Sequence, residues 1–409
     1  MSQYFLLSLI LIQWLFKLVI EGANLLNLQE NPPELLAQDF PHSTYQQSQN
    51  YLKANTFLDI LHSTFFCLLL CGLILLGAFN LLDEFARHFK YGEILTGLIF
   101  LGSLTAGYLI LDLPFRIYRT FVIEEKYGFN RTNPQTFSID FAKQIFLAAI
   151  LGGSVLACIL WIFEATGNLA GLYCWIFLAV FQVILIYFAP TWIMPLFNKF
   201  TPLAEGALKQ AIESYAKQQH FTLQGIFTMD GSKRSTKSNA FFTGFGKHRR
   251  VVLFDTLIAN HTVEELVAVF AHEIGHYKKK HIFKLFVLSL LNTGLMLFLL
   301  TWFIGNPAFL QAFGLHTPSI YASLLFFIIL YAPVSTLLSI GMNMLSRRFE
   351  YEADTYAVLT YHQPGTMISA LKKLALKNLS NLTPHPWKVA YSYSHPTVLQ
   401  RIVAIQKIQ

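Results

Sequence analysis

Two histidines and a glutamate in the segment VFAHEIGHYKKKH have the residue types and the spacing of a metal-dependent hydrolytic site. His272 and His276 are four residues apart, and Glu273 follows the first histidine. Residues four apart share one face of a helix, and the surrounding TVEELVAVFAHEIGHYKK has helical apolar spacing. Two imidazoles on one face can bind zinc, and a neighbouring carboxylate can take a proton from the attacking water. The alternative is a solvated helix with two surface histidines.

A catalytic zinc usually has three protein ligands, and the third is predicted in the later polar segment SRRFEYEADTYA. Its candidates are Glu350, Glu352 and Asp354. Glu350 and Asp354 are four residues apart and share a helical face, whereas Glu352 faces away. We predict one Zn²⁺ per chain with Glu350 as the third ligand, and Asp354 as the acceptor that orients a zinc-bound histidine. The alternative is an interfacial helix anchored by Arg347 and Arg348.

The composition places this site in a membrane protein. Of the 409 residues, 54% are hydrophobic and 13% are charged, and the mean hydropathy is +0.46. An ordinary soluble domain has about 25% charged residues. The net charge of +7 fits basic cytoplasmic loops better than a nucleic-acid partner, so we predict a lipid bilayer and no nucleic acid around this chain.

Seven apolar segments are candidates for membrane spans, since a helix needs roughly 20 apolar residues to cross the hydrocarbon core. They are Tyr4–Ile20, Phe65–Leu82, Ile94–Phe115, Ile145–Phe163, Leu169–Ile193, Ile282–Gly305 and Ile320–Gly341. The first lacks the basic start and the small-residue cleavage site of a signal peptide, so we predict that it is retained.

The distribution of Lys and Arg predicts the orientation. With the N-terminus outside, the inner segments 21–64, 116–144, 194–281 and 342–409 hold 1, 5, 12 and 8 basic residues. The outer segments hold only Arg87 and Lys90. Basic residues concentrate on the cytoplasmic side, so both large polar segments are predicted there. The four N-x-S/T sequons, at Asn130, Asn260, Asn378 and Asn381, are then chance matches.

Four segments describe the predicted organisation. Residues 1–193 form an N-terminal membrane region of five spans, and 194–281 form a cytosolic segment with a β-hairpin and the HExxH helix. Residues 282–341 form a transmembrane hairpin, and 342–409 form a cytosolic segment that completes the zinc site. NAFFTGFG and RRVVLFDT predict the two hairpin strands around a Gly-containing turn. The nearby His248 and His281 are predicted to be interfacial or solvated.

Three stretches in combination, AHEIGH, SRRFEYEADTYA and SYSHPTVLQRI, resemble the type I CAAX prenyl protease family of integral-membrane zinc endopeptidases, first recognised as the a-factor converting enzyme. The stretches EEKYGFNRTNP, MPLFNKFTPL and DGSKRSTKSNAFFTGFGKHRRVVLFDTLI extend the resemblance to nearly the whole chain. The resemblance implies an all-α polytopic membrane fold in which about seven helices form a barrel around a water-filled chamber. A small α+β zinc-protease portion would close the chamber at its cytosolic end.

The resemblance also implies roles for individual residues. His395 resembles the histidine that stabilises the tetrahedral intermediate, and Arg401 the arginine that ties the acidic helix to the site. Asn239 begins a stretch, continued by Ala240 and Phe241, that would pair with the substrate backbone. Without the resemblance, His395 could equally be a surface histidine that caps a helix, and Asn239 could be a turn residue.

The expected function is therefore a zinc-dependent membrane endopeptidase that cleaves the C-terminal tripeptide of prenylated CAAX proteins, with Glu273 as the general base. Two alternatives stay open. One is a quality-control metalloprotease that acts on membrane proteins without a prenyl requirement. The other is a transporter or channel with an incidental metal site. An ion path would need an ionisable residue deep in a span, and the sequence shows none there. We see no extra insertion between the last two spans and no C-terminal retrieval signal. We therefore predict a bacterial inner-membrane protein with its active site facing the cytoplasm.

Overall fold

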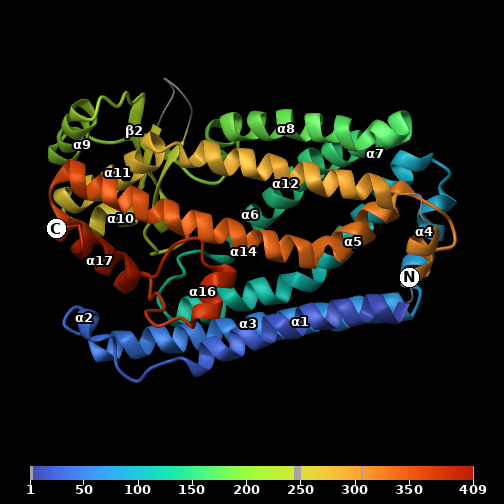
Figure 1. Cartoon of the computed structure of the whole chain (residues 1–409), viewed down its shortest axis with the longest axis horizontal. Coiled ribbons are helices and arrows are strands. Elements are labelled where there is room, and N and C mark those ends of the chain that lie inside the picture. The colour runs from blue at the N-terminus through green and yellow to red at the C-terminus, as the bar shows by residue number, and fades with distance from the viewer. Residues whose placement is uncertain (1–2, 244–249, 305–306, 409) are drawn as a thin grey trace.

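The computed structural model describes residues 3–243, 250–304 and 307–408. Long helices run side by side along the longest dimension of the molecule (Figure 1). They are α1 (Gln3–Leu26), α3 (His42–Leu75), α5 (Glu93–Tyr118), α7 (Gly153–Thr166), α8 (Ala170–Phe188), α12 (His281–Phe303) and α14 (Ile320–Tyr361). The helix α6 (Pro134–Leu147) leads through a π-helical turn into α7.

Six continuous helical stretches of the described chain are long and apolar enough to cross a membrane. One of them, Pro134–Leu196, has 63 residues and contains the predicted fourth and fifth spans. A helix rises 1.5 Å per residue, so this stretch is too long for a single crossing. It turns back at Gly167, where φ is +54°, and α7 and α8 then pack side by side. The predicted polytopic helical fold is confirmed.

The two ends of the molecule differ. At one end lie the N-terminus, α4 (Ala78–His88) and the connection from α12 to α14, which contains α13 (Pro307–Ala312). At the other end lie the sheet and the remaining helices. These are α2 (Glu34–Ala37), α9 (Ala207–Gln218), α10 (Asp255–Asn260), α11 (Val263–Lys278), α15 (Pro364–Lys377), α16 (Pro386–Ser392) and α17 (Val398–Gln406). The two large polar segments of the sequence therefore lie together at one end of the molecule.

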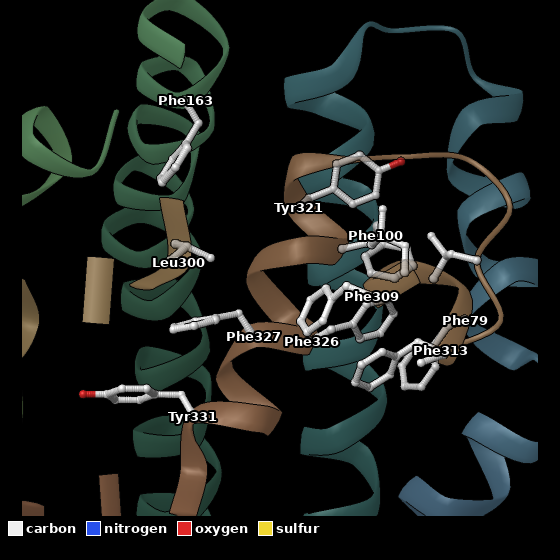
Figure 2. Packing of buried hydrophobic residues seen from close by; sticks show 14 of the residues in the cluster. Phe79, Phe100, Phe163, Leu300, Phe309, Phe313, Tyr321, Phe326, Phe327 and Tyr331 are labelled. Carbon is white, nitrogen blue, oxygen red and sulfur yellow. The ribbon is translucent and has the colours of Figure 1, made fainter. Parts of the chain in front are cut away.

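Aromatic side chains fill the core between the spans near the N-terminal end of α14 (Figure 2). The rings of Phe313 and Phe326 stack with centroids 3.7 Å apart, and Phe79 meets Phe326 edge-on at 5.3 Å. Other large apolar side chains, such as Phe298 and Trp302, are more than 70% exposed. Such exposure on long apolar helices is the pattern of lipid-facing residues, since lipid covers these surfaces instead of protein.

The sheet has four strands in the order β1-β2-β4-β3. β3 (Ala240–Thr243) and β4 (Arg250–Phe254) are antiparallel, which confirms the predicted hairpin, although its Gly-containing turn and His248 lie outside the described residues. β2 (Gly225–Met229) is parallel to β4, and β1 (Phe200–Pro202) is antiparallel to β2. Neither β1 nor β2 was predicted from the sequence. β3 forms one edge of the sheet.

Several helices extend beyond the predicted spans. α14 has 42 residues, so at 1.5 Å per residue it is about 63 Å long, twice the thickness of the hydrocarbon core. It carries the seventh predicted span and Glu350 on one continuous rod, and the predicted segment boundary at 341/342 lies inside it. The helix thereby runs from the membrane region to the polar end.

A polar cavity of about 460 Å³ lies between α3, α5 and α6. Asp112, near the end of the predicted third span, is buried there and pairs with His62 at 2.9 Å and with Arg116. Asp140, also on the cavity wall, is bound by Arg234 from the polar region. Arg234 therefore links the wall of this cavity to the segment between β2 and β3.

Candidate metal centre

The helix α11 that carries the HExxH motif has a strongly defined start. The side chain of Thr262 accepts a hydrogen bond from the backbone N–H of Glu265, and the Glu265 carboxylate accepts one from the backbone N–H of Thr262. This capping box satisfies two backbone donors that a helix leaves unpaired. Phe270 and Ile274 are buried against the sheet and α9. His272 and His276 therefore project from a helix that is fixed at its start and along its buried face.

A glycine brings the second helix of the site close to the first. A Cβ on Gly275 would lie 3.0 Å from both Cα and O of Ala353 on α14. Only hydrogen fits in that space, so α11 and α14 approach more closely at this point than two larger residues would allow. Glu350 lies one turn before Ala353 on α14, which explains how a residue from a different span reaches the motif histidines.

The side chains of His272, His276 and Glu350 converge. Nε2 of His272 and Nε2 of His276 are 3.1 Å apart. Glu350 places Oε2 3.4 Å from Nε2 of His272, and Oε1 3.2 Å from Nε2 of His276. His272 and Glu350 are buried and His276 is half-buried, so the alternative of two solvated surface histidines is wrong.

The converging atoms fit a zinc ion. Tetrahedral zinc with ligands at about 2.0–2.2 Å separates its ligand atoms by about 3.3–3.5 Å, close to the 3.1–3.4 Å distances observed here. Oε2 of Glu350 is buried without a hydrogen-bond partner. A buried carboxylate oxygen with no partner costs free energy that a cation at this position would offset. Two imidazoles and one carboxylate are also a donor set that zinc accepts.

Asp354 and Arg401 support His272. Nδ1 of His272 lies 2.8 Å from Oδ1 of Asp354, and the Arg401 guanidinium binds both oxygens of that carboxylate, at 2.8 and 2.6 Å. Arg401 also comes within 3.6 Å of Glu350. When Asp354 accepts the Nδ1 proton, the Nε2 lone pair of the neutral ring is the one available to a metal ion at the point where Glu350 and His276 converge. The structure thus brings both sequence-predicted supporting residues to the site.

Glu273 and His395 lie at the rim of the same centre. Glu273 is half-buried; burial raises its pKa above the ordinary value, against the opposing influence of His272 and His276. A raised pKa brings a carboxylate closer to the range in which it exchanges protons efficiently at neutral pH. His395 has 64% of its side chain exposed, with Nε2 3.3 Å from Oε1 of Glu350. Its exposure leaves it accessible to a bound peptide.

The stretch predicted to contact substrate is fixed at its first residues. The carbonyl of Asn239 accepts a hydrogen bond from the N–H of Phe254 on β4, and Ala240 and Phe241 continue β3 at the edge of the sheet. β3 packs against α11. An edge strand beside the metal helix has the arrangement that added-strand binding of an extended peptide needs.

Two groups of contacts were not predicted from the sequence. His281 was predicted to be interfacial or solvated, but it is only 1% exposed and lies 3.1 Å from His276. Glu352, which was predicted to lie off the helical face shared by Glu350 and Asp354, binds His281. The helical spacing of Glu352 gave no sign of this pairing, because its partner comes from the start of another helix, α12.

The second such group involves Asn378, which the sequence offered only as a chance sequon. Its side-chain Oδ1 accepts from the N–H of Ser238 at 3.1 Å, and its Nδ2 donates to the carbonyl of Ser238 at 3.3 Å. Ser238 immediately precedes Asn239. The Asn378 amide therefore pairs with the backbone at the start of the β3 segment in the way a neighbouring strand would.

Comparisons with known proteins agree along most of the chain. Residues 23–199 match the family described as CAAX prenyl protease N-terminal, five membrane helices, and residues 202–409 match peptidase family M48. The chain is 35% identical over 404 residues to CAAX prenyl protease 1 of Saccharomyces cerevisiae, covering 92% of this chain and 88% of the relative. It is 39% identical over 319 residues to the CAAX prenyl protease 1 homolog of Oryza sativa, covering 77% and 74%. The crystal structure of S. mikatae Ste24p matches with a TM-score of 0.93 at 33% identity, over 98% of both chains.

Proposed function

The chain belongs to peptidase family M48, with the membrane-helical N-terminal region of the CAAX prenyl proteases, and from this premise we propose that it removes the C-terminal tripeptide of prenylated CAAX proteins in a zinc-dependent reaction. The observation that carries the proposal is the convergence of His272, His276 and Glu350 on one point, with ligand atoms within 4.8 Å of one another. Membership of the family makes the chain a metalloprotease of a polytopic membrane type. Zinc as the metal, and the roles of the single residues, are part of the proposal.

The chain's own residues account for the steps of peptide hydrolysis. When bound, zinc supplies a Lewis acid that polarises the scissile carbonyl and makes water more acidic. Glu273 takes the proton of the attacking water and passes it to the leaving amine. His395 donates a hydrogen bond to the carbonyl oxygen as negative charge develops on it, a type of contact worth about 3–4 kcal/mol in the transition state.

Three further groups prepare the site for that reaction. Asp354 holds the tautomer of His272 whose Nε2 lone pair faces the metal position, and Arg401 holds Asp354. The edge of β3, at Asn239, Ala240 and Phe241, holds the substrate in an extended conformation through backbone hydrogen bonds. An extended backbone exposes its scissile carbonyl to Glu273 and His395. A folded segment would keep that carbonyl hydrogen-bonded within itself.

The position at the end of the spans suits a prenylated substrate. A prenyl chain on a cysteine partitions into lipid, while the adjoining peptide stays at the interface. α14 runs from the membrane region to Glu350 as one helix, so lipid-facing and peptide-facing surfaces lie on the same element. We propose that the site faces the cytoplasm, as the distribution of basic residues predicts. The origin in a bacterial inner membrane and the division at residues 193, 281 and 341 stay predictions; the relatives named above are eukaryotic.

The two alternatives from the sequence are less well supported. The relatives that match most of the chain are named CAAX prenyl protease 1 or its homolog. These names favour the proposed function over a quality-control protease without a prenyl requirement and over a transporter.

The proposed function is tested with purified protein in detergent and a farnesylated C-a-a-X peptide. We expect release of the intact tripeptide, abolished by a chelator, restored by zinc and absent in Glu273→Gln. The same peptide without the farnesyl group should be cut with a higher KM, because each buried CH₂ contributes about 0.8 kcal/mol to binding. If the farnesylated peptide stays intact while unmodified segments of membrane proteins are cut well, the prenyl assignment is wrong.

A further inference from the structure

The imidazole of His281 lies directly behind the metal-facing histidine of α11. Its Nδ1 is 3.1 Å from Nδ1 of His276, and its Nε2 is 3.1 Å from Oε2 of Glu352. Arg348 binds the other oxygen of Glu352 at 3.2 Å. A continuous series of polar groups therefore runs from the surface, through a buried ring, to the nitrogen of His276 that faces away from the metal position.

The proton arrangement in this series is determined by the chemistry of the groups. If Nε2 of His276 binds a metal, its proton is on Nδ1, and that proton needs an acceptor. Nδ1 of His281 is within reach and can accept only if His281 is neutral with its own proton on Nε2. That Nε2 proton then points at Glu352, a carboxylate that accepts it. All three contacts are satisfied by one assignment of tautomers.

We propose that His281 and Glu352 are positioning residues that fix the orientation and tautomer of His276, a role that rests on the proposed metal site. The arrangement is the counterpart of the Asp354 contact to the other ligand, His272. One metal-facing histidine is held directly by a carboxylate, and the other is held by a carboxylate acting through a second imidazole. Acceptors of this kind behind metal-bound histidines set ring orientation and ligand basicity.

The surroundings of His281 hold its ring in place. We call the contacts from Glu352 through His281 to His276 the relay. Its ring stacks on Phe349 of α14, with centroids 4.1 Å apart and planes at 6°. His281 is the first residue of α12, directly after Lys280, whose φ of +56° makes the sharp turn out of α11. The relay therefore joins the metal helix, a membrane-spanning helix and the helix of Glu350 behind a single ligand. Displacing α12 would change the orientation of His276.

The test uses variants that separate the acceptor from the packing. His281→Phe keeps a planar ring that stacks on Phe349 but removes the acceptor. His281→Asn keeps an acceptor oxygen near the position of Nδ1 and loses ring area. Glu352→Ala removes the terminal carboxylate from a residue with 32% of its side chain exposed, where misfolding is a smaller risk. Glu213→Ala removes a carboxylate on α9, outside this series of contacts and with 56% of its side chain exposed, and is the control.

Zinc affinity is measured by competition with a chromogenic chelator, and ligand geometry by the visible spectrum of the Co²⁺-loaded protein. We expect His281→Phe and Glu352→Ala to weaken zinc binding about 10–100-fold, to shift the Co²⁺ bands, and to lower kcat more than they raise KM. His281→Asn should recover most of the affinity lost in His281→Phe, and Glu213→Ala should bind zinc as the wild type does.

The outcomes distinguish the relay from a purely structural joint and from a failure of the metal assignment. If His281→Phe and Glu352→Ala lower thermal stability but bind zinc as tightly as the wild type, the relay is wrong. Equally weak zinc binding by the Asn and Phe variants would also overturn it, since the acceptor would then be irrelevant. A wild-type protein that binds no stoichiometric zinc would contradict the proposed function itself, whatever the variants do.

Discussion

Gly275 of α11 and Ala353 of α14 are in backbone contact, so close that a methyl group on Gly275 would lie 3.0 Å from the Cα and the carbonyl oxygen of Ala353. The atoms in the way belong to the backbone, which cannot rotate aside as a flexible side chain can. The contact is one turn from Glu350 on one helix and beside His276 on the other. The spacing of the two helices, and with it the spacing of the three converging side chains, therefore depends on the absence of one methyl group.

Gly275→Ala should push α14 away from α11 and displace Glu350 from the two histidines. Overpacking of this kind costs about 1–3 kcal/mol of stability, and we expect a loss of zinc affinity in addition. Gly341→Ala on α14, where a Cβ would meet nothing within 4 Å, is the control and should behave as the wild type. Zinc content and thermal unfolding in detergent measure both effects. Wild-type zinc affinity in a folded Gly275→Ala protein would contradict the argument.

The proposed ligands and the proposed base should separate in a metal assay. His272→Ala, His276→Ala and Glu350→Ala remove donor atoms, so each should purify without stoichiometric zinc and without activity. Glu273→Gln should retain one zinc per chain and lose turnover, because its carboxylate is not a ligand. Elemental analysis of the purified variants decides this. Full zinc occupancy in Glu350→Ala would show that another group is the third ligand.

Asn378→Ala should impair substrate binding without affecting the metal. The Asn378 amide pairs with both backbone groups of Ser238, so its removal loosens the segment that leads into β3. We expect a higher KM for peptide substrates, a smaller change in kcat and unchanged zinc content. Asn378→Asp, which keeps the acceptor for the Ser238 N–H and loses the donor, should be intermediate. A KM equal to that of the wild type would remove Asn378 from the substrate-positioning elements.

The start of the metal helix should show a defined pH dependence through Glu265. Burial alone would raise the pKa of this carboxyl, but hydrogen bonds from Lys373 and Ser369 and from the Thr262 backbone lower it below its usual value. A lowered pKa in the folded state means that the stabilisation is complete at neutral pH. It is lost as the pH falls below the unfolded value of about 4.3 toward the folded one.

Glu265→Gln should therefore lower the free energy of unfolding at neutral pH, by about 1–3 kcal/mol for the loss of a buried charged acceptor. The difference between variant and wild type should shrink below about pH 4, where the wild-type carboxyl also takes up a proton. Thermal unfolding of both proteins in their metal-free forms avoids the separate effect of acid on metal binding. A difference that stays constant down to about pH 3 would contradict the assignment of the shifted pKa to Glu265.

The proposed orientation is open to direct labelling. A single cysteine at Lys233, introduced into a variant without the four native cysteines, should resist an impermeant thiol reagent in intact cells and react after permeabilisation. A cysteine at Gln311, in α13 at the opposite end of the molecule, should show the reverse behaviour. Labelling of the cysteine at Lys233 in intact cells would show that the proposed topology is inverted and that the metal centre lies on the outer side.

Local spacing in the sequence was enough for those parts of the protein whose geometry is local. Residues four apart share a face on any helix, so the sequence alone is sufficient to pair His272 with His276. The membrane helices and the β3–β4 hairpin follow from apolar length and from alternation within a few residues. Short strands without such a pattern, β1 and β2, gave no comparable signal.

Only the tertiary structure decided which distant groups meet. Glu350 was one of three acids in a short segment, and the Gly275 contact that brings its helix to the motif is a property of two surfaces, not of one segment. Likewise His281 looked like an interfacial residue, but Phe349 covers its ring and Glu352 binds it. Helical periodicity gives the direction of a side chain relative to its own axis. The group that it meets depends on where a second helix packs, and that position is set by contacts between residues far apart in the chain.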